Sequence, residues 1–498
     1  MNQPAKPNGV KADTDPPVDD KPHLPKPNGA ALMNGHGILY QTADGMPRRS
    51  WRTWLIGRHL ATKDAAEQTI GKAIGLAVFA SDALSSTAYA TQEILAILAA
   101  AGSAAFGYSF PIAIAIIGLL AIVTVSYEQT IHAYPGGGGA YIVARDNLGE
   151  LPAQTAGAAL LTDYILTVSV SVSSGVAQLV SAFPVLDPWR VAIAVGLIGF
   201  IMLINLRGVK ESGVAFAIPT YFFIGMMFVT VGIGLARYIF GSLGAVPDPP
   251  SMHAGTQAVG QVGLFLILHA FSSGTAALTG VEAISNGITA FKAPRSRNAG
   301  VTLIWMSLIL GSLFLSITFI AGRIGAVPSE EETVISQLAR TILSGRGPLY
   351  LAVIAATTLI LIMAANTAFA DFPRLSALHA GDGFLPRQLT YRGSRLVYSR
   401  GIVVLAIIAS LLVFVFNASV TALIPLYAIG VFLSFTLSQA GMARRWWKIG
   451  HLKPGEEVKE PGSVLRYERG WQWKLVVNGV GAACTAVVMV IFAVTKFR

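Results

Sequence analysis

The chain alternates long apolar stretches with short polar loops. From residue 70 onward we count about eleven stretches long enough to cross a hydrocarbon core of roughly 30 Å, which takes about 20 residues of helix. They cover residues 70–101, 108–133, 152–184, 189–206, 213–240, 261–290, 299–322, 349–372, 401–417, 420–442 and 475–495. The pattern predicts an all-α polytopic membrane protein.

The first 50 residues follow a different pattern. They are polar, rich in Pro, Gly, Asp and Lys, and they repeat KPNG at Lys6 and Lys26. Such a segment buries too little apolar surface to fold alone, and it lacks the continuous apolar core of a signal peptide. We therefore expect a disordered cytoplasmic tail at 1–60, a ten-helix transport core at 61–442, and a cytoplasmic loop with an eleventh helix at 443–498.

Composition agrees with this class, and the charges orient the chain. The sequence is 53% hydrophobic and 12% charged, against about 25% charged in an average soluble domain. One short loop contains Lys292, Arg295 and Arg297 without an acid, whereas the loop at 323–346, on the opposite side, balances its arginines with glutamates. Because basic loops stay cytoplasmic, the N-terminus is predicted to be cytoplasmic. The net charge of +10 is then explained mainly by basic cytoplasmic loops, and we expect no nucleic-acid partner.

Three carboxylates stand out within the apolar stretches: Asp82, Asp163 and Glu282. An ionisable group inside a membrane costs several kcal/mol unless it faces a cavity or a partner, so each is a functional candidate. Hydroxyl groups accompany them at helical spacing, namely Tyr89 seven residues after Asp82, Thr167 and Ser171 at i+4 and i+8 from Asp163, Thr279 three residues before Glu282, and Tyr427 in the tenth span. A single Ser or Thr more often bonds back to a helix carbonyl; the combination indicates a site.

Two spans are predicted to be discontinuous. SDALSS at 81–86 and FSSGTAALTG at 271–280 are rich in small and hydroxyl residues, which weaken a helix and let the backbone unwind where it lines a cavity. They occupy equivalent places in two five-span halves. Interrupted helices at equivalent places are typical of an inverted-repeat transporter with its site at the midplane of the membrane.

The run PGGGG from Pro135 does not change this picture. It lacks the Lys and the Ser or Thr of a phosphate-binding loop, so it does not favour an enzyme, and we interpret it as a flexible or re-entrant gate between the second and third spans. The single cysteine, Cys484, excludes an intramolecular disulfide and a cysteine metal cluster. No cofactor is expected.

The chemistry of the candidate groups favours a cation. Carboxylates and hydroxyls supply oxygen ligands that suit a hard cation and oppose an anion, and no Arg or Lys lies in the core of the predicted spans. Neutral oxygens can replace the hydration shell of a monovalent ion, and a buried carboxylate can exchange a proton. His132 and His269 are further, weaker candidates for a proton relay. An amino-acid or amine permease and a passive channel remain as alternatives.

Several long motifs resemble a known family. SDALSSTAYATQEIL, the run SYEQTIHAYPGGGGAYIVARDNLG from Ser126, TDYILTVSVSVSSG from Thr162 and FSSGTAALTGVEAISNGI from Phe271 are similar to those of the KimA-type potassium importers. These form the potassium-uptake-permease branch of the amino acid-polyamine-organocation superfamily. The resemblance covers residue 70 to the end of the chain. It implies two inverted five-helix repeats and potassium-proton symport across a bacterial inner membrane.

The resemblance also assigns roles to residues. It implies potassium ligands at Tyr89, Thr167, Ser171, Thr279 and Tyr427, proton coupling or ion attraction at Asp82, Asp163 and Glu282, and a position near the site for Tyr164. It further implies a homodimer. Family members continue past a VTKF-like stretch into a twelfth helix and a cytoplasmic domain that helps hold the dimer, and this sequence ends inside that stretch, at Thr495–Arg498. We therefore expect a truncated chain, in which dimerisation is not assured.

Overall fold

The computed structural model describes residues 69–207, 209–250, 262–393, 397–460 and 463–496. It also describes two antiparallel two-residue strands, β1 (Leu32–Met33) and β2 (Leu39–Tyr40); the rest of the predicted 1–60 tail lies outside the described residues. Within this part of the chain, ten helices are long and apolar enough to span a membrane, and α14 (Ser399–Val415) is a shorter apolar helix. The predicted all-α polytopic class is confirmed.

The membrane helices form two halves and one additional helix. The first half comprises α2 (Lys72–Ser85), α3 (Ala90–Leu98), α4 (Ser109–Ala133), α6 (Glu150–Ala182), α7 (Arg190–Arg207) and α8 (Val209–Ile239). The second comprises α9 (Leu264–Gly274), α10 (Ala283–Asn286), α11 (Arg295–Ile324), α13 (Pro348–Gly381), α14 and α15 (Val420–Gly450), and α16 (Trp471–Lys496) follows. A short helix follows the second membrane span of each half: α5 (Gly139–Asn147) follows α4, and α12 (Val334–Ile342) follows α11.

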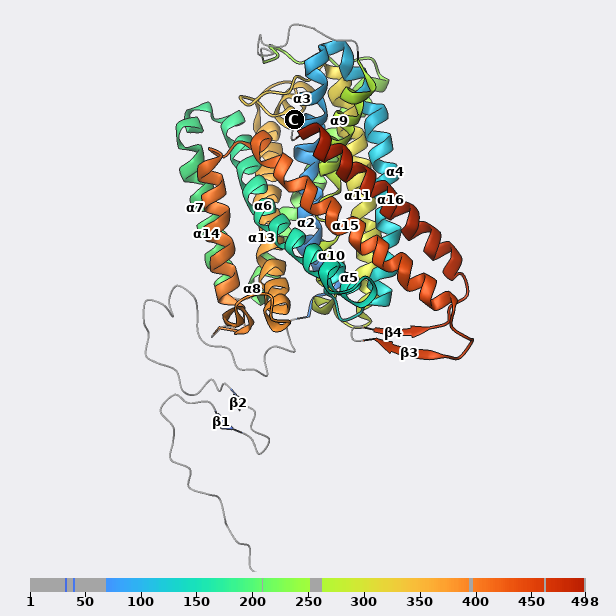
Figure 1. Ribbon diagram of the computed structural model, residues 1–498. Helices are drawn as coiled ribbons and strands as arrows, with labels where there is room; N and C mark the ends of the chain where they lie inside the picture. The colour runs from blue at the N-terminus through green and yellow to red at the C-terminus, as the bar shows by residue number, and fades with distance from the viewer. Residues whose placement is uncertain are drawn as a thin grey trace, which may run out of the picture.

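The first span of each half is broken, as the sequence predicts. A 3₁₀ turn and Tyr89 separate α2 from α3, and a second 3₁₀ turn with the extended residue Thr279 and the left-handed Gly280 separates α9 from α10. The broken spans run in opposite directions, with α3 and α9 together at one end of the bundle (Figure 1). This antiparallel arrangement is that of an inverted repeat.

Hydroxyl side chains hold these breaks. Ser85 and Thr87 each donate to the carbonyl three residues earlier, at 2.7 Å, and Thr275 does the same at 2.6 Å. A helix that changes to a 3₁₀ turn or to extended chain loses backbone donors for its last carbonyls, and the hydroxyls replace them. The Ser and Thr content of the two segments is thus the local cause of the breaks.

Two helices extend well past their predicted ends. The predicted eighth span ends at residue 372, but α13 continues to Gly381; the tenth ends at 442, but α15 continues to Gly450. The predicted domain boundary at 442 therefore falls inside α15, and the domain division stays a prediction. The longer α13 also includes Arg374, which lies beyond the predicted span and in the last turns of the helix.

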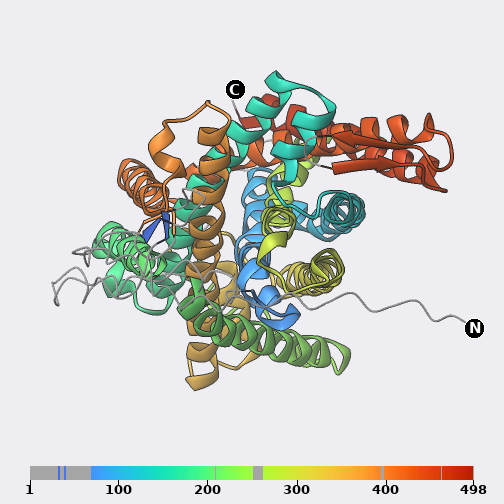
Figure 2. The ribbon, with the colours of Figure 1, turned by 90° about the horizontal axis from the view of Figure 1, so that it is seen from below.

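The C-terminal elements pack along one side of the bundle. α15 and α16 lie side by side, and the antiparallel hairpin of β3 (Glu457–Glu460) and β4 (Ser463–Arg466) lies at their end near α5 (Figures 1 and 2). Arg445 fixes the hairpin, donating to Ser463 Oγ at 2.6 Å and to the Val464 carbonyl at 3.2 Å, and its guanidinium covers the Tyr134 ring. Burial raises the pKa of Tyr134, so its hydroxyl stays neutral at physiological pH.

Candidate functional site

The two broken helices touch at Asp82 and Gly280. A Cβ atom on Gly280 would lie 2.7 Å from both the Asp82 carboxyl carbon and the Ala83 backbone nitrogen. Ser86 links the breaks directly, because its hydroxyl reaches the Ala277 carbonyl at 3.0 Å. The close approach depends on a residue without a side chain at position 280, where φ is +80°. It places the Asp82 carboxylate at the junction of the two halves.

The three predicted carboxylates gather at this junction. Asp82, Asp163 and Glu282 are each at most 3% exposed, and the Asp163 and Glu282 side chains are within hydrogen-bond reach of each other. Asp82 is an electrostatic neighbour of both. One oxygen of each carboxyl group has no hydrogen-bond partner in the protein. Buried charge of one sign is costly unless it is compensated, so the cluster requires protons or a cation.

Four predicted hydroxyls form a chain beside the carboxylates. Thr167 Oγ1 donates to the Tyr427 hydroxyl at 3.2 Å, and the Tyr89 hydroxyl is within hydrogen-bond reach of Tyr427 and Thr279. Thr279 uses its own proton on the Ala276 carbonyl at 2.8 Å. The chain therefore connects α6, α15 and both breaks, and Thr279 keeps its oxygen lone pairs for an electropositive partner. Neutral oxygens from four elements converge next to negative charge.

The other predicted residues take different places. Ser171 is buried on α6, four residues after Thr167. Its role as a ligand stays a prediction. His132 lies at the end of α4, where it is half exposed and pairs with Glu128 at 3.1 Å, away from the junction. His269 packs against Phe265 in α9. The structure thus groups the carboxylates and most of the hydroxyls, and it leaves His132 outside the group.

Some neighbours of the cluster escape the sequence reasoning. Tyr127 of α4 and Asp371 of α13 are buried within electrostatic range of Glu282. Tyr127 lies in the SYEQT motif, and a tyrosine in an apolar helix is too ordinary to be singled out as a site residue from sequence. Asp371 is the next-to-last residue of the predicted 349–372 span, where a carboxylate is ordinarily solvated; in the structure it is buried, because α13 continues to Gly381.

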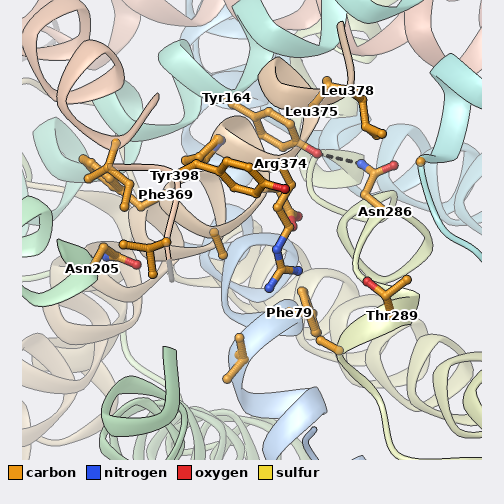
Figure 3. Close-up of a pocket in the computed structure, with 18 of the residues that line it drawn as sticks. Phe79, Tyr164, Asn205, Asn286, Thr289, Phe369, Arg374, Leu375, Leu378 and Tyr398 are labelled. Atoms are coloured by element: carbon orange, nitrogen blue, oxygen red, sulfur yellow. Dashed lines mark hydrogen bonds between the residues drawn. The ribbon is translucent and has the colours of Figure 1, made fainter. Parts of the chain in front are cut away.

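A cavity of about 410 Å³ lies on one side of the cluster, at the end of the bundle where α2 begins. Tyr164 and Asn286 line it, and Asn286 Nδ2 donates to the Tyr164 hydroxyl at 2.6 Å (Figure 3). Tyr164 directly follows Asp163 in α6, and Asn286 is one turn after Glu282. The hydrogen bond therefore lies in the cavity wall and is formed by residues close in the chain to two of the three carboxylates.

The glycine-rich run packs against the same hydrogen bond. Gly136 and Gly138 line the cavity, and a Cβ atom on Gly139, where φ is +47°, would lie 1.7 Å from Asn286 Oδ1. Only glycine allows this approach. The run thus contacts Asn286 in the cavity wall; its role as a gate stays a prediction.

Comparison with known proteins fits this geometry. A family model described as amino acid permease matches residues 69–496. The chain belongs to this permease family. The permease is also 46% identical over 451 residues to the potassium transporter KimA of Bacillus subtilis (strain 168), an alignment that covers 90% of the permease and 70% of that relative. The resemblance read from the motifs is confirmed, and the protein is a multi-pass membrane permease.

Proposed function

We propose that this permease imports potassium together with protons across a bacterial inner membrane. The observation that carries the proposal is the chain of neutral hydroxyls from Thr167 to Thr279, beside three buried carboxylates at the junction of two broken helices. Hydroxyl oxygens can replace the hydration shell of a monovalent cation, as carbonyl oxygens do in potassium filters. The similarity to a potassium transporter supports the choice of ion.

The carboxylate cluster gives a physical reason for proton coupling. Two carboxyl groups form a hydrogen bond only if one carries a proton, and Asp163 and Glu282 are within that distance. With Asp82 they would bring three negative charges into the membrane interior if all were ionised, at a cost of several kcal/mol per ion. Protons and one potassium ion together neutralise the cluster. In this mechanism the site changes access when it carries both the ion and its protons and again when it returns empty, whereas a site that carries only one of the two does not.

The orientation rests on the cytoplasmic N-terminus predicted from the basic loops. With the N-terminus in the cytoplasm, the end of the bundle where α2 begins is the inner end, and the cavity beside Tyr164 and Asn286 opens toward the cytoplasm. The structure then corresponds to an inward-facing form in which the Tyr164–Asn286 hydrogen bond covers the cluster. Uptake ends when this bond opens and the ion leaves through the cavity.

An amino acid or amine is the second candidate, because the family description names amino acids. Permeases of this architecture hold the substrate carboxylate at backbone amides of a broken helix. Here the Asp82 carboxylate lies against Gly280 at that turn and would repel a second carboxylate. Arg374, which lines the cavity, lies on the far side of Tyr164 and Asn286. The arrangement favours the inorganic cation.

Rubidium uptake into proteoliposomes tests the proposal. We expect tracer uptake that is inhibited by external potassium, increases with an inward proton gradient and collapses with a protonophore. Glu282→Gln should abolish the proton dependence, whereas Glu331→Gln, on the exposed outer loop, should retain it. Uptake of a labelled amino acid without potassium transport would overturn the choice of ion. Potassium flux indifferent to the proton gradient would overturn symport.

A further inference from the structure

The inner cavity contains a fourth buried carboxylate that the proposed site does not use. Asp371 of α13 is 3% exposed and lines the cavity, and neither of its carboxylate oxygens has a hydrogen-bond partner in the protein. A carboxylate without any hydrogen bond is costly to bury. A purely structural aspartate would have donors on at least one oxygen, so the arrangement indicates a group that receives a partner from the cavity.

One face of α13 connects this carboxylate to the main cluster. Thr367 donates to the Ala364 carbonyl at 2.7 Å and lies within reach of Asp82. Asp371 follows Thr367 by four residues, which places both side chains on one face of the helix. Asp371 is also an electrostatic neighbour of Glu282 and Tyr164. A cation that leaves the cluster on this side of the Tyr164–Asn286 hydrogen bond therefore meets Asp371 first.

A positive side chain shares the cavity with Asp371. Arg374 lies three residues further along α13 and reaches into the space between Tyr164 and Phe79 (Figure 3). Its Nη1 atom is buried without a hydrogen-bond partner, so it is not tied to the Asp371 carboxylate. It is nevertheless close enough to act electrostatically on Asp371. A nearby positive charge weakens the hold of the carboxylate on a cation.

We infer that Asp371 is the centre of a second, inner site for a monovalent cation, at which potassium pauses between the main cluster and the cytoplasm. The inference rests on the proposed function and adds the path of release. Passage through a pore requires sites that attract the ion yet release it. Asp371 supplies the attraction, and Arg374 limits its strength.

Transport from the cytoplasmic face tests the inner site. Full-length variants are reconstituted, and rubidium flux is measured while potassium is varied either inside or outside. For Asp371→Asn we expect the half-saturating internal potassium concentration to rise about tenfold, which corresponds to about 1.4 kcal/mol, while the external value changes less than about twofold. Asp382→Asn, at the end of the same helix and paired with Arg145, is the matched control and should leave both values unchanged.

A second set of variants separates an ion site from a structural ion pair. If Asp371 only balanced Arg374, Arg374→Gln would break the same pair and raise the internal value as Asp371→Asn does; for an ion site Arg374→Gln lowers the internal value, because a repelling charge is removed. Asp371→Glu keeps the charge and should stay within about threefold of wild type, a change of about 0.7 kcal/mol at about 1.4 kcal/mol for each tenfold. A raised internal value in Arg374→Gln overturns the inference.

The outcomes also distinguish this inference from the proposed function. Wild-type potassium flux with an unchanged internal value in Asp371→Asn overturns the inner site alone. Absence of potassium flux in the wild-type protein overturns the proposed function and the inner site with it. If Asp371→Asn does not fold, Arg374→Gln and Asp371→Glu decide, because an unchanged internal value in the former excludes an electrostatic effect on the ion.

Discussion

Gly280 is the position where a single methyl group should disable the permease. The residue has φ +80° and lies against Asp82, so Gly280→Ala has two costs. An L-residue in the left-handed region loses about 1 to 2 kcal/mol, and an added methyl group in a packed core costs about 1 to 3 kcal/mol. Together these give about 2 to 5 kcal/mol, a large part of the stability of an ordinary domain.

The geometry shows how the protein would relieve this cost. The new Cβ would lie 2.7 Å from the Ala83 nitrogen, whereas ordinary contacts begin at 3.4 Å, so the two broken helices must separate by the difference, about 0.7 Å. Backbone cannot turn away as a side chain can. In enzymes a misplacement of about 1 Å costs roughly 100-fold in rate. We expect a comparable loss of rubidium uptake, because Asp82 moves away from its partners.

Thermal unfolding in detergent and uptake in proteoliposomes measure the two effects. Gly280→Ala should melt below the wild type and transport at least tenfold more slowly. Gly118→Ala in α4 is the control, because its Cβ meets nothing within 4 Å and alanine is favoured over glycine in a helix by up to about 1 kcal/mol. A Gly280→Ala protein with wild-type melting temperature and wild-type uptake would refute the contact between the two breaks.

Three further outcomes are expected. Tyr427→Phe keeps the ring but removes the oxygen that accepts from Thr167. In uptake kinetics the half-saturating external potassium concentration should rise about tenfold, which corresponds to about 1.4 kcal/mol. A wild-type value would contradict the role of Tyr427 as a ligand. Tyr164→Phe removes the acceptor of Asn286 and should speed potassium-rubidium exchange, whereas unchanged exchange would exclude a gate. Arg445→Gln removes bonds to β4, so hydrogen exchange in residues 457–466 should accelerate while the membrane helices stay protected; uniform acceleration would count against a local anchor.

Much of the site can be predicted from sequence because its groups violate the local pattern. Asp82, Asp163 and Glu282 are recognisable because a carboxylate in an apolar span is energetically costly unless it has a functional partner. The breaks are recognisable because Ser, Thr and Gly weaken a helix and can serve its free carbonyls. Tyr164, by contrast, follows from family resemblance only, since a tyrosine in an apolar helix has many ordinary roles.

Asp371 and Arg374 show where sequence reasoning ends. Hydropathy places the end of the eighth span at residue 372, because charged residues follow it. In the structure α13 continues to Gly381, and its extra turns pack His379 against Tyr141 of α5 and Gly157 of α6. A charge that the sequence assigns to a solvated helix end thus becomes part of a cavity wall.

By itself the sequence determined the membrane class, the number and approximate bounds of the spans, the two breaks and the identity of most candidate ligands, because each depends on local hydropathy or helical spacing. Only the tertiary structure decided which groups meet. The Asp163–Glu282 contact, the hydroxyl chain from Thr167 to Thr279 and the Gly280 approach join elements more than a hundred residues apart. Such contacts depend on the packing of two halves, which no local pattern encodes.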